Sequence, residues 1–274
     1  MRGFALALAA AAAAFPGSAD AGFPITTRMT CPIGGAPFDF TTTTALTTFG
    51  ERPDGKPFAS WGMPVQLPEC PDNGLVLYNE AFDAAEVERL RALVASPDYQ
   101  ALRAGHGQYY RAAWLMRRMG AGEEAVLAML VEATWEADDN PALRRRYLEE
   151  LASGASALPA PATLHALVIR ARGINALREL GRFDEARALF AATPLERFRA
   201  PLSPAVRGDL EDGEAKEQRR ALMRYFSNIR RVVARRDASL LPPDMIGRRG
   251  RRWLCGNPDD HIPAEAAFCA RRTG

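Results

Sequence analysis

The cysteines are the residues of this sequence whose type and spacing best fit a chemical role. Residues 31–35 read Cys-Pro-Ile-Gly-Gly and residues 70–74 read Cys-Pro-Asp-Asn-Gly. Both resemble a Cys-Pro-x-Cys-Gly zinc knuckle whose second cysteine is replaced, by Gly34 in the first and by Asn73 in the second. A structural zinc site needs four ligands, which two thiolates cannot supply. The sequence therefore predicts a pair of knuckle turns that bind no metal.

The first 21 residues have the three-part layout of a secretory signal peptide. Arg2 supplies a positive charge, residues 4–15 are apolar, and Ala19-Asp20-Ala21 offers a cleavage site. The apolar run is shorter than the ~20 residues that a transmembrane helix needs. We therefore expect a periplasmic or secreted protein that is cleaved near Ala21 and has no transmembrane segment.

An even number of cysteines in an exported chain indicates disulfides. The four cysteines, Cys31, Cys70, Cys255 and Cys269, allow three connectivities. We favour Cys31–Cys70, because knuckle turns bring their cysteines together, and Cys255–Cys269, which would close a short C-terminal loop. Each bridge would stabilise the fold by roughly 3–4 kcal/mol. A single site of four thiolates that joins the two ends of the chain is the alternative.

Local catalytic signatures are absent from the sequence. It has no His-Glu-x-x-His, no Gly-x-Ser-x-Gly, no phosphate loop and no dinucleotide-binding glycine motif. Its three histidines, His106, His165 and His261, lie far apart along the chain. Residues 257–261, Asn-Pro-Asp-Asp-His, could ligate a cation beside Cys255, but we favour a polar turn that caps a helix starting near Pro263. We expect no catalytic, cofactor-binding or metal-binding residues, and the sequence favours a non-enzymatic protein.

The positive charge is concentrated near the C-terminal end. Residues 219–252 hold eleven arginines and two aspartates, a net charge of +9, whereas the whole chain has a net charge of +2. Residues 218–237 predict an amphipathic helix, because apolar residues repeat on one face and arginines on the other. A compact basic loop is expected to follow it. The predicted basic surface comprises Arg220, Arg224, Arg231 and Arg235 on the helix and Arg248, Arg249, Arg251 and Arg252 in the loop.

Such a surface would attract polyanions. Nucleic acid is a poor candidate for an exported protein, so an anionic lipid, an envelope polymer or an acidic protein is the expected partner. The alternative is a helix that packs on the core through its apolar face and exposes its arginines only to solvent. Arginine is the default basic residue of the chain, in which Lys56 and Lys216 are the only lysines.

The pattern of residues divides the chain into four regions: the signal peptide (1–21), a β/loop module (22–80), a helical domain (81–195) and a basic helix with a C-terminal tail (196–274). In the module, Thr41–Thr44 and Leu75–Tyr78 have strand character. The helical pattern begins at Asp83, which forms a start signal with Glu86. Helices are expected over residues 83–95, 109–119, 123–137, 140–153, 163–180 and 184–192. A further short helix is expected to begin at Ser96-Pro97, because proline is tolerated at the first helical position.

Residues 180–190, Leu-Gly-Arg-Phe-Asp-Glu-Ala-Arg-Ala-Leu-Phe, resemble the centre of a tetratricopeptide repeat. In that reading, Gly181 allows the turn between two helices, Ala186 lets them approach closely, and Phe190 fills the adjacent core. Residues 119–125 resemble a weaker copy of the same turn. The first-helix signature of the repeat is missing around residues 170–174, so an ordinary helical hairpin is the alternative.

Residues 30 to about 193 resemble a bacterial family of unknown function that joins Cys-Pro-x-Cys-Gly knuckles to tetratricopeptide-like helices in the same order. The chain departs from that family at Gly34 and Asn73, so zinc binding does not carry over. The resemblance implies a mainly α fold with a small N-terminal β/loop module, and it implies no activity.

Three functional hypotheses follow from the sequence. The first is a binding or scaffold protein of the cell envelope that uses a concave helical groove, as helical repeats do, or the arginine-rich surface. The second is an envelope hydrolase whose site lies between the N-terminal module and the helices. The third is a purely structural protein. A polar pocket with a perturbed carboxylate or histidine would favour the hydrolase, whereas aromatic and basic lining residues would favour binding.

Overall fold

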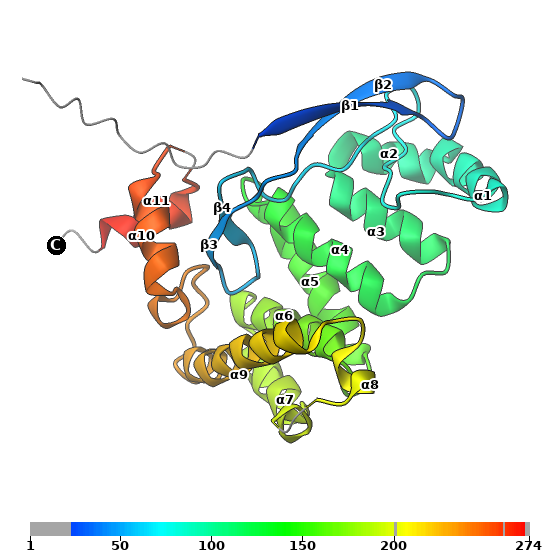
Figure 1. Ribbon diagram of the computed structural model, residues 1–274. Coiled ribbons are helices and arrows are strands. Elements are labelled where there is room, and N and C mark those ends of the chain that lie inside the picture. The colour runs from blue at the N-terminus through cyan, green and yellow to red at the C-terminus, as the bar shows by residue number, and fades with distance from the viewer. Residues whose placement is uncertain (1–22, 200–201, 260, 272–274) are drawn as a thin grey trace, which may run out of the picture.

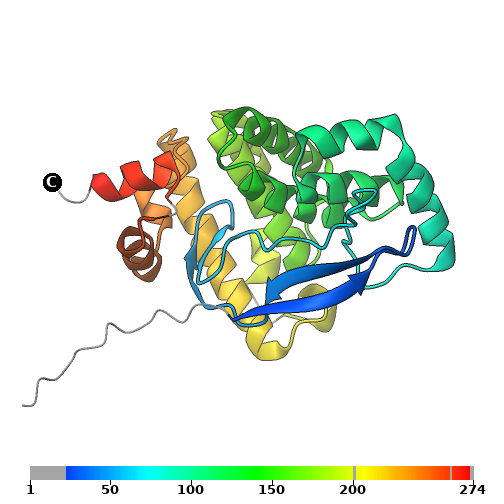
Figure 2. The same cartoon turned by 90° about the horizontal axis from the view of Figure 1, so that it is seen from above.

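The computed structural model describes residues 23–199, 202–259 and 261–271 (Figure 1). The expected signal peptide lies outside these residues. The described fold is mainly helical and carries a small strand module at its N-terminal end, as the sequence predicted. Figure 2 shows the C-terminal helices at one end of the molecule and the first helices at the other.

The strand module consists of two antiparallel pairs. Strand β1 (Pro24–Thr30) pairs with β2 (Pro37–Thr43), and β3 (Thr48–Glu51) pairs with β4 (Pro57–Ala59). The threonine-rich segment therefore forms a strand, as predicted. Threonines also face each other across the first pair, where the Thr26 and Thr41 hydroxyls lie 2.8 Å apart.

The prediction of a strand over Leu75–Tyr78 was wrong. Its apolar residues are buried, but only an isolated bridge between Glu69 and Val76 forms there. The amide of Leu75 donates to the side chain of Asn73 at 2.9 Å and so belongs to the second knuckle turn. A buried run of four apolar residues fits a loop beneath a disulfide as well as it fits a strand.

Successive helices α3 to α7 each pack against the next, in chain order (Figure 1). Polar caps that the sequence contains begin several helices: Asp83 and Glu86 form a capping box on α1, and Asn140 caps α5. The bounds are α1 (Ala84–Ala95), α2 (Pro97–Gly105), α3 (Gln108–Arg118), α4 (Glu123–Glu136), α5 (Pro141–Ala157), α6 (Leu164–Glu179) and α7 (Phe183–Ala191). Helix α5 runs one turn past its predicted end at residue 153.

Small residues allow the close approach of α5, α6 and α7. A Cβ atom on Gly173 would lie 2.3 Å from the Cβ of Ala155, so glycine is required at this crossing. Ala186 is fully buried on α7, and Gly181 forms the α6–α7 turn with φ +75°. Phe190 is half-buried and packs edge-on against Phe226, with ring centroids 5.9 Å apart. The hairpin therefore packs as the resemblance implied, while its assignment to the tetratricopeptide family stays a prediction.

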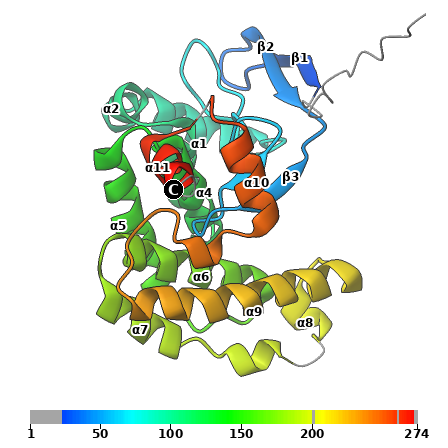
Figure 3. The same ribbon diagram turned by 90° about the vertical axis from the view of Figure 1, so that its left-hand side faces the viewer.

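The predicted amphipathic helix is α9 (Asp212–Ala234), which packs against α6 and α7. Figure 3 shows it running along α6. Its apolar face is buried, including Leu222, Phe226 and Ile229. Short helical turns precede and follow it: η1 (Leu195–Phe198), α8 (Pro204–Arg207) and η2 (Pro243–Met245).

The predicted basic loop over residues 248–252 is instead the first half of helix α10 (Arg248–Gly256), so that prediction was wrong. Helix α11 (Pro263–Ala270) follows. Gly250 lies inside α10, where it serves packing. A Cβ atom on Gly250 would lie 2.9 Å from the ring of Phe58, so its absence lets α10 rest on the β3–β4 hairpin. Phe58, Leu254 and Phe268 lie in the small core of this end.

Candidate functional site

The two knuckle turns have the same backbone geometry. In each, the cysteine carbonyl accepts a hydrogen bond from the amide four residues later, and the cysteine amide donates to the carbonyl five residues later, at 2.9–3.1 Å. The Cys31–Cys70 disulfide joins the turns, with the two Cα atoms 5.5 Å apart. This bridge and the Cys255–Cys269 bridge confirm both predicted pairings.

Asn73, at one of the lost ligand positions, connects the two turns. Its Nδ2 donates to the carbonyl of Ile33 at 3.1 Å and lies 3.5 Å from the Sγ of Cys31. Its Oδ1 accepts from the amide of Leu75. The Asn73 side chain thus holds the first turn against the second. In an intact zinc knuckle, a cysteine thiolate at this position would bind the metal. The arrangement is a structural joint that uses a disulfide and an amide.

The turn between β3 and β4, residues 52–56, is inserted among the helices, and we call it the groove turn. The carbonyl of Pro53 accepts hydrogen bonds from Arg172 of α6 and from the hydroxyl of Tyr225 of α9, both at 2.8 Å. The carbonyl of Asp54 accepts from the indole of Trp135 on α4 at 3.3 Å. The backbone of this turn is therefore hydrogen-bonded to side chains of α4, α6 and α9.

Buried ion pairs fix the groove turn in place. The Arg52 guanidinium lies 2.6 Å from Asp54 and 2.8 Å from Asp138, which follows α4. Arg144 of α5 bridges Asp54, Asp138 and Glu179 at 2.8–3.0 Å. Opposite charges alternate through this cluster, so each buried charge has partners of opposite sign, as a stable buried ion pair requires.

The electrostatics of the cluster follow from its packing. Burial alone would raise the pKa of the Asp54 carboxyl, but Arg52 and Arg144 lower that pKa well below its usual range. Burial would likewise lower the pKa of Arg52, and Asp54 and Asp138 raise it above its usual value. Both groups are therefore charged at neutral pH, and the cluster acts as an electrostatic joint between the N-terminal module and the helices.

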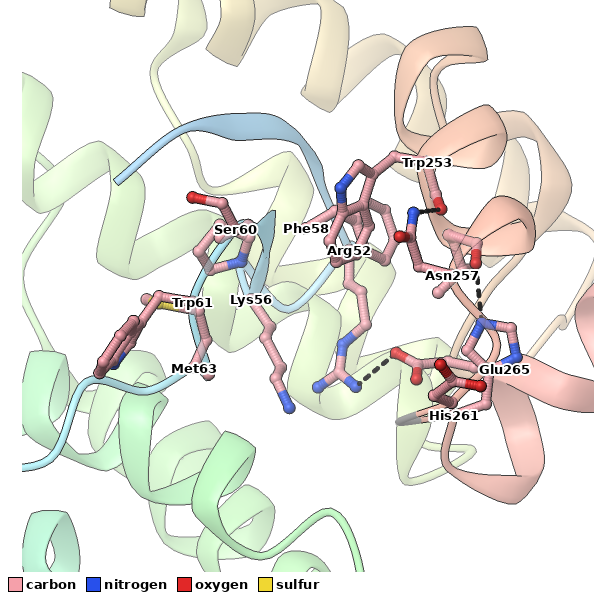
Figure 4. Close-up of a pocket in the computed structure, with 15 residues that line it drawn as sticks. Arg52, Lys56, Phe58, Ser60, Trp61, Met63, Trp253, Asn257, His261 and Glu265 are labelled. Atoms are coloured by element: carbon pink, nitrogen blue, oxygen red, sulfur yellow. Dashed lines mark hydrogen bonds and ion pairs between the residues drawn. The ribbon is translucent and has the colours of Figure 1, made fainter. Parts of the chain in front are cut away.

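A pocket of about 570 Å³ opens beside this joint, between the β3–β4 hairpin and the C-terminal helices (Figure 4). Figure 4 shows Trp61 and Met63 on one side, Trp253 and Glu265 on the other, and Lys56 between them. The lining residues combine aromatic side chains with groups of both charges. Those used below are Arg52, Lys56, Phe58, Trp61, Trp253 and Glu265.

The aromatic wall is rigid. The ring of Trp253 stacks on that of Phe49, with centroids 5.4 Å apart, and lies 6.2 Å from the ring of Phe58. Asn257 donates to the carbonyl of Trp253 at 2.7 Å, and the Nε2 of His261 donates to the carbonyl of Leu254 at 2.8 Å. The polar turn that the sequence predicted before α11 thus forms one wall of the pocket.

The second disulfide closes the loop that carries this wall. Cys255 lies in the last turn of α10 and Cys269 lies in α11, with their Cα atoms 5.4 Å apart. The pocket residues Asn257, His261 and Glu265 all lie between these two cysteines. The bridge therefore constrains the pocket as well as closing the short C-terminal loop that the sequence predicted.

The arginines of the predicted basic surface divide into two sets. Arg220, Arg224, Arg231 and Arg235 are exposed on α9, and we call them the α9 arginine row. The α9 row is partly neutralised at its end, where Arg235 lies 2.5 Å from Asp244. On α10, Arg248, Arg249 and Arg252 are exposed, and Arg249 also lies over the ring of Phe49. Arg251 is half-buried and donates to the carbonyl of Ile246.

Other sites are not evident in the part of the chain that the structure describes. There, no group of three His, Cys, Asp or Glu side chains is placed to hold a metal ion. No helix within the described ranges is both long and apolar enough to cross a membrane. Comparison of the chain with protein-family models, with characterised proteins and with solved structures found no match.

Proposed function

We propose that this protein is an exported binding protein of the cell envelope and that it holds a small ligand in the pocket between the β3–β4 hairpin and α10–α11. The observation that carries the proposal is the lining, in which aromatic walls face a floor of fixed charged groups. Pockets of 300–1,000 Å³ with apolar walls and a few polar groups are typical of small-molecule sites.

Binding fits this pocket better than catalysis does. All the N–H groups of Arg52 face carboxylates, and the ammonium of Lys56 pairs with Asp138 at 2.7 Å. The hydroxyl of Ser60 accepts from the amide of Thr47 at 3.1 Å, and the ring of His261 donates to a carbonyl. These four side chains are held by the fold, which suits recognition, and their contacts pair no nucleophile with a general base.

An envelope hydrolase is the second candidate. The carboxylates of Asp259 and Glu265 line the same wall of the pocket, and hydrolysis of a glycosidic bond commonly uses two carboxylates. The pocket also lies between the N-terminal module and helices, where that hypothesis expected a site.

Export is supported by the disulfides and by the N-terminal sequence. Both bridges suit an oxidising compartment, such as the periplasm or the exterior of the cell. The charged, apolar and small-residue segments of residues 1–21 have the order of a signal peptide. In this proposal the α9 arginine row holds the protein near an anionic envelope component or an acidic protein.

The test uses the purified, oxidised protein and the low-molecular-weight fraction of an enzymatic envelope digest. We expect this fraction to raise the melting temperature of the wild type and of Trp114→Phe, but not that of Trp61→Phe. Trp61 lines the pocket, whereas Trp114 packs against Tyr99 and Arg118 in another part of the fold. Absence of any ligand-induced shift would refute the pocket as a ligand site. Time-dependent cleavage of a component by the wild type alone would favour the hydrolase.

A further inference from the structure

Opposite charges alternate along the floor of the pocket. The ammonium of Lys56 lies 2.7 Å from Asp138, and Asp138 lies 2.8 Å from the guanidinium of Arg52. Arg52 in turn lies 3.5 Å from the carboxylate of Glu265. A cation therefore ends this row on one side and an anion ends it on the other. Both ends line the pocket.

The two ends of the row keep hydrogen-bonding capacity that its middle has used. An ammonium carries three N–H groups, and Lys56 directs one of them to Asp138. Among the residues that the structure describes, the carboxylate of Glu265 has only long contacts, at 3.5 Å to Arg52 and at 3.3 Å to the amide of Ile262. Lys56 can thus donate to a ligand and Glu265 can accept from one, whereas four of the five N–H groups of Arg52 already donate to Asp54 and Asp138.

Both ends are largely shielded from solvent. The side chain of Lys56 is 21% exposed and that of Glu265 is 11% exposed. A ligand that fills the pocket removes the remaining water from both charges, and this loss costs free energy unless charges of opposite sign replace it. An anionic ligand would face Glu265, and a cationic ligand would face Lys56. A neutral ligand would displace that water without offering a charged partner to the unused N–H groups of Lys56 or to the carboxylate of Glu265.

We infer that the ligand is zwitterionic, with its ammonium beside Glu265 and its carboxylate beside Lys56. A free amino acid or a short peptide has these two groups, and an apolar side chain on it would pack against Phe58 and the two tryptophans. This inference rests on the proposed function, because it names the ligand class of the same pocket. Lys56 is one of only two lysines in a chain whose other basic residues are arginines.

The experiment is calorimetric titration of the oxidised full chain with four probes. These are the dipeptide alanylphenylalanine, its N-acetyl derivative, its C-terminal amide, and the derivative that carries both caps. We expect the free dipeptide to bind about tenfold or more tightly than either singly capped form, since one charged contact is lost with each cap. The doubly capped form should bind weakest.

Two variants assign each ligand charge to a residue. Glu265→Gln should weaken the dipeptide and its amide about tenfold while leaving the N-acetyl form almost unchanged. Lys56→Met should weaken the dipeptide and the N-acetyl form while leaving the amide almost unchanged. The matched controls are Glu217→Gln and Lys216→Met on the exposed surface of α9, which should bind as the wild type does. Circular dichroism and melting temperature establish that each variant folds.

The outcomes separate this inference from the proposed function. Equal affinity for all four probes, or the same loss for each probe in both variants, would overturn the zwitterion and leave the pocket as a ligand site. If neither these probes nor the envelope digest bind, both the inference and the proposed function fail. If the digest binds and the four probes do not, only the zwitterion is refuted.

Discussion

Replacement of Asp54 by asparagine tests whether the ion cluster holds the groove turn among the helices. The change keeps the shape of the side chain and removes a charge that is 4% exposed and contacts both Arg52 and Arg144. Removal of one partner from a buried ion pair typically costs about 3–5 kcal/mol, because the remaining charge is left without compensation. We expect the free energy of unfolding to fall by that amount.

Urea unfolding at pH 7, with both disulfides intact, measures this loss. The matched control is Asp39→Asn, which breaks the pair between Asp39 and Arg28 on the exposed β1–β2 ribbon, where both side chains are about 60% exposed. An exposed pair contributes about 0–1 kcal/mol. The two variants make the same chemical change, so the difference between them reports the burial of Asp54.

The pH dependence provides a second measurement. Burial opposes the ionised form of Asp54, but the two arginines outweigh it and depress the pKa in the folded state. The pKa in the unfolded chain is about 3.9. Stability from this group is therefore fully present above about pH 5 and is lost as pH falls below about 4. The asparagine variant should lose less stability than the wild type over that range. Equal losses for Asp54→Asn and Asp39→Asn at pH 7 would refute the reasoning.

Three other predictions concern the rest of the fold. Ala186→Leu should lower the free energy of unfolding by about 1–3 kcal/mol through overpacking, and an unchanged melting temperature would contradict the close α6–α7 crossing. Replacement of Cys31 and Cys70 together by serine should cost about 2–5 kcal/mol in urea unfolding. Co-sedimentation of the protein with anionic liposomes should weaken between 0.1 and 1 M salt, because the Debye length falls from ~10 to ~3 Å. It should also weaken in a variant whose α9 arginine row is changed to glutamine. Equal sedimentation of this variant and the wild type would exclude the α9 arginine row as the binding surface.

Local signals predicted the parts of the fold that local physics determines. The helical period and the polar caps located helices such as α1 and α5, and the matching turns around Cys31 and Cys70 predicted their bridge. The segment 248–252 was wrongly predicted as a loop. The glycine within it, Gly250, is needed where α10 meets the ring of Phe58, which belongs to a different element. A sequence window contains no information about such a contact.

The pocket could not be predicted for the same reason. Lys56 and Glu265 lie at opposite ends of the sequence and meet only after the hairpin has been inserted among the helices. The weak signal that was available is the choice of lysine at position 56 in an arginine-rich chain. The groove turn itself, Arg-Pro-Asp-Gly-Lys, reads as an ordinary surface turn. Nothing in the local sequence around Asp138, Arg144 and Glu179 indicates that these charged residues pack around the groove turn.

The insertion of the groove turn has a consequence for the order in which the chain can acquire its native state. The turn is synthesised early, but Pro53 bonds to Tyr225, 172 residues later, and Arg52 pairs with Glu265, later still. Chains generally begin to fold from the N-terminal end during synthesis. Here the groove turn is synthesised long before α9 and α11, which supply some of its partners. A nascent chain that stops before α9 therefore contains Arg52 and Asp54 but lacks the contacts that Tyr225 and Glu265 make with the turn. Completion of the fold is therefore expected to follow release of the whole polypeptide, as one late cooperative event.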